Sequence, residues 1–292
     1  MYYKNPSYKA FYYCNVFILL IVSILCVLPM LHILAVSFSG KSAAEGNLVT
    51  FLPIDFNLDS YSETLSNGNF LNAIRVSVMR TLIGTAVSMA VTILAAFPLS
   101  KSGYEFKGRS LYVWFFLFIM IFGAGLIPHY ILIQKVNLIG SFWVYILPHA
   151  LNIWNIILMM NFFRNIPKEL DEAAIMDGAG SFGILLKIYL PVSMPAIATL
   201  SLFSMVGQWN NWFDGMLYMS SPDQWPLATL LQTIIVALDL SKTGIDFEQL
   251  ELLSNRSVKA AQIFIAMLPI LAVYPFLQRY FVKGIVLGAV KE

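Results

Sequence analysis

The densest group of side chains able to bind a polar molecule lies between residues 208 and 214. It combines amides, indoles and a carboxylate, namely Gln208, Trp209, Asn210, Asn211, Trp212 and Asp214. A smaller group of the same kind contains Asn152, Trp154 and Asn155. Amides and carboxylates hydrogen-bond to hydroxyl groups, while aromatic rings pack against flat apolar faces. Because residues four apart share one helix face, Gln208 and Trp212 are predicted to line one passage together.

The same residues also fit a structural role, in which amides join neighbouring helices and indoles anchor helix ends. Both interpretations stay open for each residue. Asp214 is the sharper case, because a carboxylate surrounded by hydrocarbon is costly unless it is paired or faces water. We therefore expect Asp214 to have a partner or to lie at the exit of a cavity. For Arg80, which lies in another apolar run, snorkelling to the outer surface is the simpler expectation.

Two glycine motifs suggest nucleotide chemistry but lack its context. Gly178, Gly180 and Gly183 match GxGxxG, yet the preceding residues indicate a helix, whereas a dinucleotide site needs a strand there. We interpret these glycines as a turn. The run from Gly40 to Ser42 resembles the end of a phosphate-binding loop, but Ala35 stands where that motif needs a glycine. The chain is therefore not expected to hydrolyse ATP itself.

Metal and acid–base chemistry also lack a motif. His32, His129 and His149 are far apart, with no HExxH or paired-carboxylate spacing. Cys14 and Cys26 lie in one apolar run, which indicates neither a disulfide framework nor a metal site. The sequence thus predicts neither an enzyme nor a cofactor within this chain.

Composition places the chain in a membrane. Of its 292 residues, 59% are hydrophobic and only 12% charged, whereas soluble domains carry about 25% charged residues. A net charge of +2 is too small to predict nucleic acid as a partner. Six segments are long and apolar enough to cross a bilayer, and the sequence predicts an all-α polytopic membrane protein with about six transmembrane helices. They are 14–37, 77–99, 110–132, 141–163, 196–219 and 258–281.

The distribution of lysine and arginine predicts the orientation of these spans. Six spans place both termini on one side, which carries eleven basic residues against six on the other. The eleven are Lys4, Lys9, Lys101, Lys107, Arg109, Arg164, Lys168, Lys187, Arg279, Lys283 and Lys291. Because cytoplasmic loops are rich in Lys and Arg, the termini and the 164–195 loop are predicted to be cytoplasmic. The long loop 220–257 is then extracytoplasmic.

The 166–195 segment is predicted to form a helix, a turn and a second helix. Pro167 suits a first helical turn, and Gly178 and Gly180 can end the helix through positive φ. Ser181 can cap the second helix, which Pro191 and Pro195 would stop. Such a pair is either a linker lying on lipid or an element gripped by another protein. The acids of the first helix favour docking, because anionic lipid repels them.

This loop also carries a resemblance. Glu172-Ala173-Ala174, Asp177-Gly178-Ala179, Ile188, Leu190-Pro191 and Pro195 are similar to the EAA loop of ABC importer permeases. Trp209-Asn210, Ser221-Pro222 and Pro226-Leu227 resemble the carbohydrate-uptake permeases of that superfamily. The resemblance covers essentially the whole chain and implies one transmembrane permease domain over 1–292, of the type I ABC importer fold.

The resemblance implies roles and partners as well. A coupling helix at about Glu172 to Ala179, together with Pro191, would dock on an ATPase subunit, with Glu172 paired to a basic ATPase residue. The partners would be a second permease subunit, two ATPase subunits that bind ATP and Mg, and an extracytoplasmic solute-binding protein. The complex would lie in a bacterial cytoplasmic membrane and move a sugar or oligosaccharide by alternating access. Sugars would then be the solute that the amides and indoles of 208–214 receive.

Two finer points complete the expectations. The run GLIPHYILI, which begins at Gly125, and the WNNWFDG run look closest to permeases for plant-polysaccharide oligosaccharides, including pectin- or xylan-derived fragments. The alternatives from other classes are a membrane-embedded scaffold and a self-sufficient secondary carrier. An inverted repeat or an ionisable relay through several spans would favour the carrier, and the sequence has neither.

Overall fold

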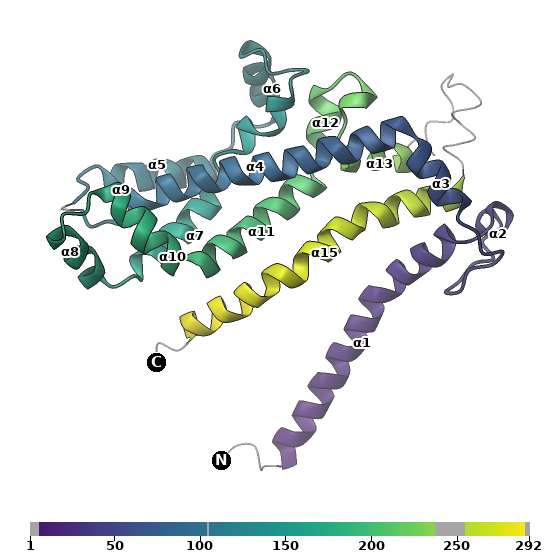
Figure 1. Cartoon of the computed structure of the whole chain (residues 1–292), viewed down its shortest axis with the longest axis horizontal. Coiled ribbons are helices and arrows are strands. Elements are labelled where there is room, and N and C mark those ends of the chain that lie inside the picture. Colours follow the sequence, from purple (N-terminus) through teal and green to yellow (C-terminus); the bar gives the residue numbers. More distant parts are fainter. Residues whose placement is uncertain (1–5, 104, 237–254, 290–292) are drawn as a thin grey trace. The chain divides into compact units, whose positions relative to one another are not determined.

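The computed structural model describes residues 6–103, 105–236 and 255–289, and within these ranges the regular structure is entirely helical. Figure 1 shows these helices in sequence order along the chain. The chain divides into two compact units. One contains Met1–Phe70 and Leu231–Leu268, and the other contains Leu71–Leu230 and Pro269–Glu292. Of the predicted 220–257 loop, residues 237–254 lie outside the described part of the chain.

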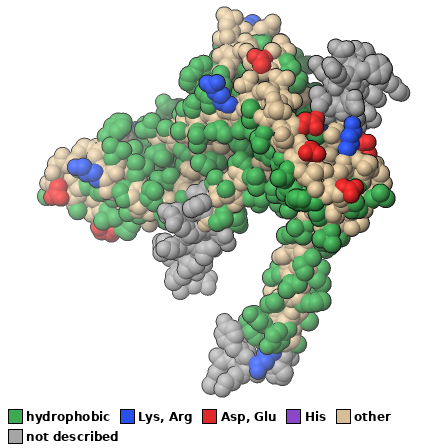
Figure 2. Space-filling model, turned by 45° about the vertical axis from the view of Figure 1, so that its right-hand side comes forward, with side chains coloured by type: hydrophobic (Ala, Val, Ile, Leu, Met, Phe, Trp, Pro, Cys, Tyr) green, Lys and Arg blue, Asp and Glu red, His purple; other side chains and the backbone are tan. Residues whose placement is uncertain are grey.

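The first unit is built on α1 (Pro6–Ser37), α2 (Lys41–Glu45) and α3 (Asp59–Ser66). None of the residues in the most apolar stretch of α1 is buried, as expected of a helix whose solvent is lipid. Hydrophobic side chains accordingly cover much of the visible surface in Figure 2. At the other end of α1, Ser37 Oγ lies 2.7 Å from the Tyr61 hydroxyl, and Phe38 packs on Phe56 and Tyr61.

The second unit contains most of α4 (Gly68–Ser100) and a series of shorter helices. These are α5 (Arg109–Ile121), α6 (Leu126–Lys135), η2 (Phe142–Tyr145), η3 (Leu147–His149), α7 (Ile153–Arg164), α8 (Lys168–Met176), α9 (Ser181–Ile184), the π-helical turn η4 (Leu185–Tyr189), α10 (Leu190–Val192), α11 (Met194–Asn210), α12 (Phe213–Tyr218), η5 (Pro222–Gln224) and the start of α13 (Leu227–Val236). The second part of α15 (Arg256–Ala289) also belongs here.

Two apolar clusters hold the second unit together. The larger joins α4, α7, the α9–η4 segment and α11, with three rings at its centre. The Tyr189 ring lies 5.0 Å from that of Phe97 and 5.2 Å from that of Phe163, both edge to face. The smaller cluster gathers Val144, Tyr145 and Tyr218 near the other end of α4. Helix α4 also buries polar side chains, among them Arg80, Thr85 and Ser88.

The predicted membrane spans are confirmed in number, but half of them are not straight helices. Within the described residues, α1, α4 and α15 are long and apolar enough to cross a membrane unbroken. Three further spans are bent pairs, so up to six crossings are present. These pairs are α5 with α6 at 114°, η2–η3 with α7 at 46°, and the segment Ser181–Val192 with α11 at 81°.

Three predicted spans, 110–132, 196–219 and 141–163, were wrong as continuous helices, and the last of them consists of η2, η3 and α7 with a break before Ile153. The first breaks after Ile121, and Gly125 adopts φ +82° and ψ 175°, a conformation essentially restricted to glycine. The second ends at Asn210 and resumes at Phe213, because Asn211 takes an extended conformation with ψ 102°. Hydropathy reports how apolar a segment is and does not detect such interruptions.

The helix–turn–helix predicted for 166–195 is present, with local corrections. Helix α8 ends as expected at Gly178, whose φ is +79° and whose N–H donates to Ile175 O at 2.9 Å. Gly180, however, has φ −76° and does not supply the left-handed residue. Ser181 makes no side-chain cap and is the first residue of α9. The helical path continues through Pro191 and breaks at Ser193.

Candidate functional site

The break between α11 and α12 turns polar groups toward the middle of α4. Asn211, in the break, donates from Nδ2 to Asp214 Oδ2 at 2.8 Å. Its Oδ1 accepts from the Asp214 backbone N–H at 3.4 Å. Asp214 thereby lies in the first turn of α12, where the free N–H groups favour a carboxylate. The interruption thus brings Gln208, Asn211 and Asp214 to one place.

Arg80 of α4 lies at the centre of this polar cluster. Its side chain is fully buried and forms an ion pair with Asp214. Nε donates to Gln208 Oε1 at 3.1 Å and Nη1 to Asn211 O at 2.9 Å. The guanidinium also lies over the Tyr145 ring, 4.7 Å from its centroid. The expectation that Asp214 has a partner is confirmed, and the expectation that Arg80 snorkels to the surface was wrong.

His149 extends the cluster toward solvent. Its Nε2 lies 2.8 Å from Asp214 Oδ2, and 40% of its side chain is exposed. Gly84 lets Gln208 come close to α4, because a Cβ there would lie 2.9 Å from the glutamine amide. Neither residue was expected from the sequence. The sequence did contain one signal for this contact, because Arg80 and Asp214 carry opposite charges and each lies in an otherwise apolar segment.

A polar cavity of about 500 Å³ opens beside this cluster, among α4, the η3–α7 segment and α11. Its polar lining consists of Ser88, His149, Asn152, Ser204, Gln208 and Asn211. Trp154 and Phe203 add aromatic surface to the same lining. The cavity therefore combines hydrogen-bonding groups with aromatic rings, and it joins the two groups of residues singled out in the sequence.

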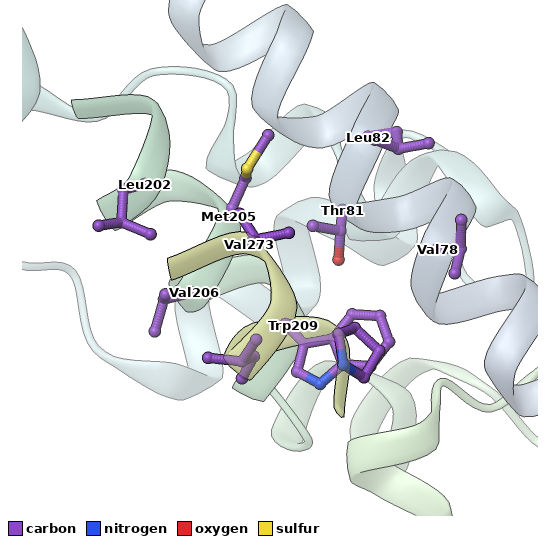
Figure 3. A pocket seen from close by; sticks show the side chains of 10 residues that line it. Val78, Thr81, Leu82, Leu202, Met205, Val206, Trp209 and Val273 are labelled. Atoms are coloured by element: carbon purple, nitrogen blue, oxygen red, sulfur yellow. The ribbon is translucent and has the colours of Figure 1, made fainter. Parts of the chain in front are cut away.

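Other members of the predicted set lie elsewhere. Trp209 lines a separate apolar cavity of about 220 Å³, where it faces Val78, Thr81 and Val273 (Figure 3). Asn155 is buried in α7, and its backbone N–H donates to Asn152 Oδ1 at 3.1 Å. Asn210 and Trp212 are exposed and do not line the polar cavity. The prediction that Gln208 and Trp212 line one passage was wrong, because the helix ends between them.

The residues predicted to couple to an ATPase gather on and beside α8. Glu172, Ala173, Asp177 and Gly178 are exposed, and Ala174 and Ala179 are half-buried against the larger apolar cluster. Pro191 is exposed in α10. Apolar side chains flank the acids, with Met176 87% exposed and Phe182 70% exposed. This surface is therefore both acidic and apolar, as a protein-binding surface often is.

A buried carboxylate fixes the opposite face of α8. Asp171 is the buried residue of this helix, and its Oδ2 accepts from Lys101 Nζ at 2.5 Å and from the Tyr189 hydroxyl at 2.8 Å. Among the described residues, no group of three or more His, Cys, Asp or Glu side chains forms a metal site. The two features available for function are thus the polar cavity and the α8 surface.

Comparison with known proteins identifies the family. Residues 106–287 match the model of the binding-protein-dependent transport system inner membrane component. This chain belongs to that family. The permease is 39% identical over 283 residues to Protein LplC of Bacillus subtilis strain 168, covering 97% of this chain and 95% of LplC. It is 38% identical to the polygalacturonan/rhamnogalacturonan transport system permease protein YtcP of the same strain, covering 94% and 95%.

A solved structure confirms the fold of the permease. A chain of a bacterial ABC transporter involved in the import of the acidic polysaccharide alginate superimposes with a TM-score of 0.85. The two chains are 29% identical, and the match covers 95% of this chain and 98% of the other. The chain is therefore a multi-pass inner-membrane component of a binding-protein-dependent transport system, as the EAA resemblance implied.

Proposed function

We propose that this permease provides the path by which an oligosaccharide crosses the membrane, with alternating access driven by separate ATPase subunits. The observation that carries the proposal is the polar cavity between α4, α7 and α11. Helices in lipid normally present apolar residues, and buried polar side chains there mark solute paths. The Ser, Asn and Gln groups of this cavity match sugar hydroxyls, and Trp154 offers a flat surface to a sugar ring.

The sugar-path residues proposed from the sequence divide by position. Gln208, Asn211 and Asn152 line the cavity and are assigned to solute contact. Asp214 is proposed to hold the cavity residues in place and not to contact the solute, because its carboxylate already accepts from Arg80, His149 and Asn211. Trp209, Asn210, Trp212 and Asn155 are assigned structural roles, since they do not face the cavity. Of the eight residues predicted from the sequence to line the solute path, three are therefore proposed to contact the solute.

The surface of α8 is proposed as the coupling element. Glu172 is exposed and has no intramolecular partner competing for a basic ATPase residue in the part of the chain described. Ala173 and Gly178 are small and exposed, which permits a close approach, and Met176 supplies apolar contact area. Ion pairs and apolar contacts together are typical of such docking. Binding of the ATPases would therefore act on the permease through this helix.

The remaining partners and the orientation follow the family pattern. A second permease subunit, two ATPase subunits and an extracytoplasmic solute-binding protein complete the proposed importer, with ATP and Mg held by the ATPases. The termini and the 164–195 loop are proposed to be cytoplasmic, and the 220–257 loop to face the binding protein. Pectin-derived oligosaccharides are the proposed cargo, supported by similarity to YtcP, whose name specifies polygalacturonan and rhamnogalacturonan.

The test is purification of a tagged chain from its native membrane in mild detergent, with mass spectrometry of the proteins that remain bound. We expect an ATPase and a second six-span chain to accompany the wild-type chain. Glu172→Lys should release the ATPase while the chain stays in the membrane, because it reverses the charge offered to the partner. Glu169→Lys, on the same helix, is the matched control. A lone wild-type chain that still passes sugars in vesicles would establish a self-sufficient carrier instead.

A further inference from the structure

The face of α8 opposite the proposed ATPase surface is held by a three-residue polar cluster. Lys101 Nζ, directly after the end of α4, donates to Asp171 Oδ2 at 2.5 Å and to the Tyr189 hydroxyl oxygen at 3.0 Å. The Tyr189 hydroxyl itself donates to Asp171 Oδ2 at 2.8 Å. We call Lys101, Asp171 and Tyr189 the α8 joint. It connects three segments that are distant in the sequence: the end of α4, α8, and the turn leading to α11.

The joint is shielded and aromatic on one side. The side chains of Lys101 and Asp171 are 16% and 10% exposed. The Lys101 ammonium lies over the rings of Phe97 and Tyr189, 4.7 and 4.4 Å from their centroids. A charge pair that is partly desolvated and also contacts aromatic faces interacts more strongly than an exposed surface pair. These three groups therefore move together more readily than they separate.

The other attachments of α8 are weak. Asp171 is the buried residue of this nine-residue helix, and Ala174 contributes only a methyl group to the apolar cluster. Beside the joint, a cavity of about 590 Å³ is lined by Lys101, Asp171, Ile175 and Phe182. Helix α8 is thus not packed solidly against α4, and its tie to α4 runs mainly through charged and hydroxyl groups. Within the described residues, Asp171 Oδ1 is buried and has no hydrogen-bond partner, so the hydrogen bonds to this carboxylate that the structure shows all reach Oδ2.

From this geometry we propose that the α8 joint is the mechanical link that carries displacement of α8 to α4 and α11, and that Asp171 and Lys101 are positioning residues for coupling. The proposal rests on the proposed function of α8 as the ATPase-docking element. Helices α4 and α11 both line the polar cavity, so motion of their ends through the joint would open or close the solute path. Glu172 would contact the ATPase subunit, and a displacement of α8 that follows from this contact would be transmitted through the adjacent Asp171.

The experiment uses the assembled importer, with its ATPases and loaded binding protein, reconstituted in vesicles. Lys101→Met removes the charge but keeps the length of the side chain. We expect the variant to retain its ATPases and basal hydrolysis, while solute moved per ATP falls about tenfold. Lys101→Arg, which preserves the ion pair, should restore most of that ratio. Lys107→Met, an exposed lysine in the same loop, is the matched control and should behave as wild type.

A second variant separates coupling from folding. Lys101→Met with Asp171→Leu replaces the buried pair by apolar groups, which proteins often tolerate without loss of stability. We expect this double variant to be as poorly coupled as Lys101→Met alone, because both lack the same link. Wild-type solute transport per ATP in either variant would overturn the proposal, as would failure of Lys101→Arg to restore it. Loss of the ATPases from Lys101→Met would also overturn it, since the joint would then serve docking. Absence of ATPases from the wild-type chain would instead refute the proposed function.

Discussion

At the scale of single residues, the polar cavity and the ion pair behind it have separate roles. Arg80 and Asp214 neutralise each other and use Gln208, Asn211 and His149 to satisfy their remaining groups. Ser204 and Trp154 line the same cavity and take no part in that cluster. Substitution of Arg80 or Asp214 should therefore mainly affect stability, and substitution of Ser204 or Trp154 should mainly affect transport.

Removing one member of the ion pair should destabilise the permease strongly. Arg80→Leu leaves Asp214 buried without its main counter-charge, and breaking a buried pair in this way costs about 3–5 kcal/mol. Thermal unfolding of the purified chain in detergent measures the loss. The double variant Arg80→Leu, Asp214→Leu should be more stable than Arg80→Leu alone, because no unpaired charge remains. If the double variant is the less stable of the two, the pair is not the reason for the loss.

Filling the cavity should slow transport without unfolding the chain. Ser204→Leu adds bulk to the lining, and we expect uptake of oligosaccharide by the assembled importer to fall roughly tenfold, equivalent to about 1.4 kcal/mol. Ser201→Leu, three residues earlier on α11 and outside the lining, is the control. Equal uptake by both variants would mean that the solute does not pass through this cavity.

At the scale of elements, the interruptions of the helices matter as much as the helices. The sequence predicted the number of spans correctly, because hydropathy depends only on the composition of a segment. It did not predict the breaks at Phe122–Gly125 and at Asn211–Trp212, which depend on the backbone dihedrals of individual residues. The α11–α12 break brings Asp214 next to Arg80 of α4. The sequence therefore predicted that Asp214 has a partner but did not identify Arg80 as that partner.

The break between α5 and α6 offers a direct test of this view. Gly125→Ala places a side chain where φ is +82° and ψ is 175°, a conformation that costs other residues about 1–3 kcal/mol. A lower unfolding temperature is the expected result. Gly123→Ala, two residues away and without positive φ, is the matched control and should unfold near the wild-type temperature. A continuous α5–α6 helix would predict that both alanines stabilise the chain.

At the scale of the whole molecule, composition and the EAA resemblance predicted the class of protein, and the family match confirms it. They did not predict which polar residues line the cavity and which serve only the packing of the helices. That division depends on where α11 ends, because the break after Asn210 changes the direction in which the following side chains point. The α8 joint was equally hidden, since Lys101, Asp171 and Tyr189 are separated by up to 88 positions. A spatial cluster of this kind has no signature in a single sequence.

The proposed orientation can be measured on intact cells with single cysteines in a chain lacking Cys14 and Cys26. Lys107→Cys, exposed in the loop between α4 and α5 and outside the α8 surface, should react with a membrane-impermeant maleimide only after the membrane is opened. Leu52→Cys, which is 77% exposed in the loop after α2, should react before it is opened. Labelling of Lys107→Cys in intact cells would reverse the orientation derived from the eleven and six basic residues.

The charge balance of the Arg80–Asp214 pair has an electrical consequence. One unpaired elementary charge moved across a membrane potential changes the free energy by about 2.3 kcal/mol per 100 mV. Arg80 and Asp214 are in contact and carry opposite charges, so a movement that takes both together transfers no net charge through the field. A displacement of the middle of α4 that carries the pair along would therefore do no electrical work on these two charges.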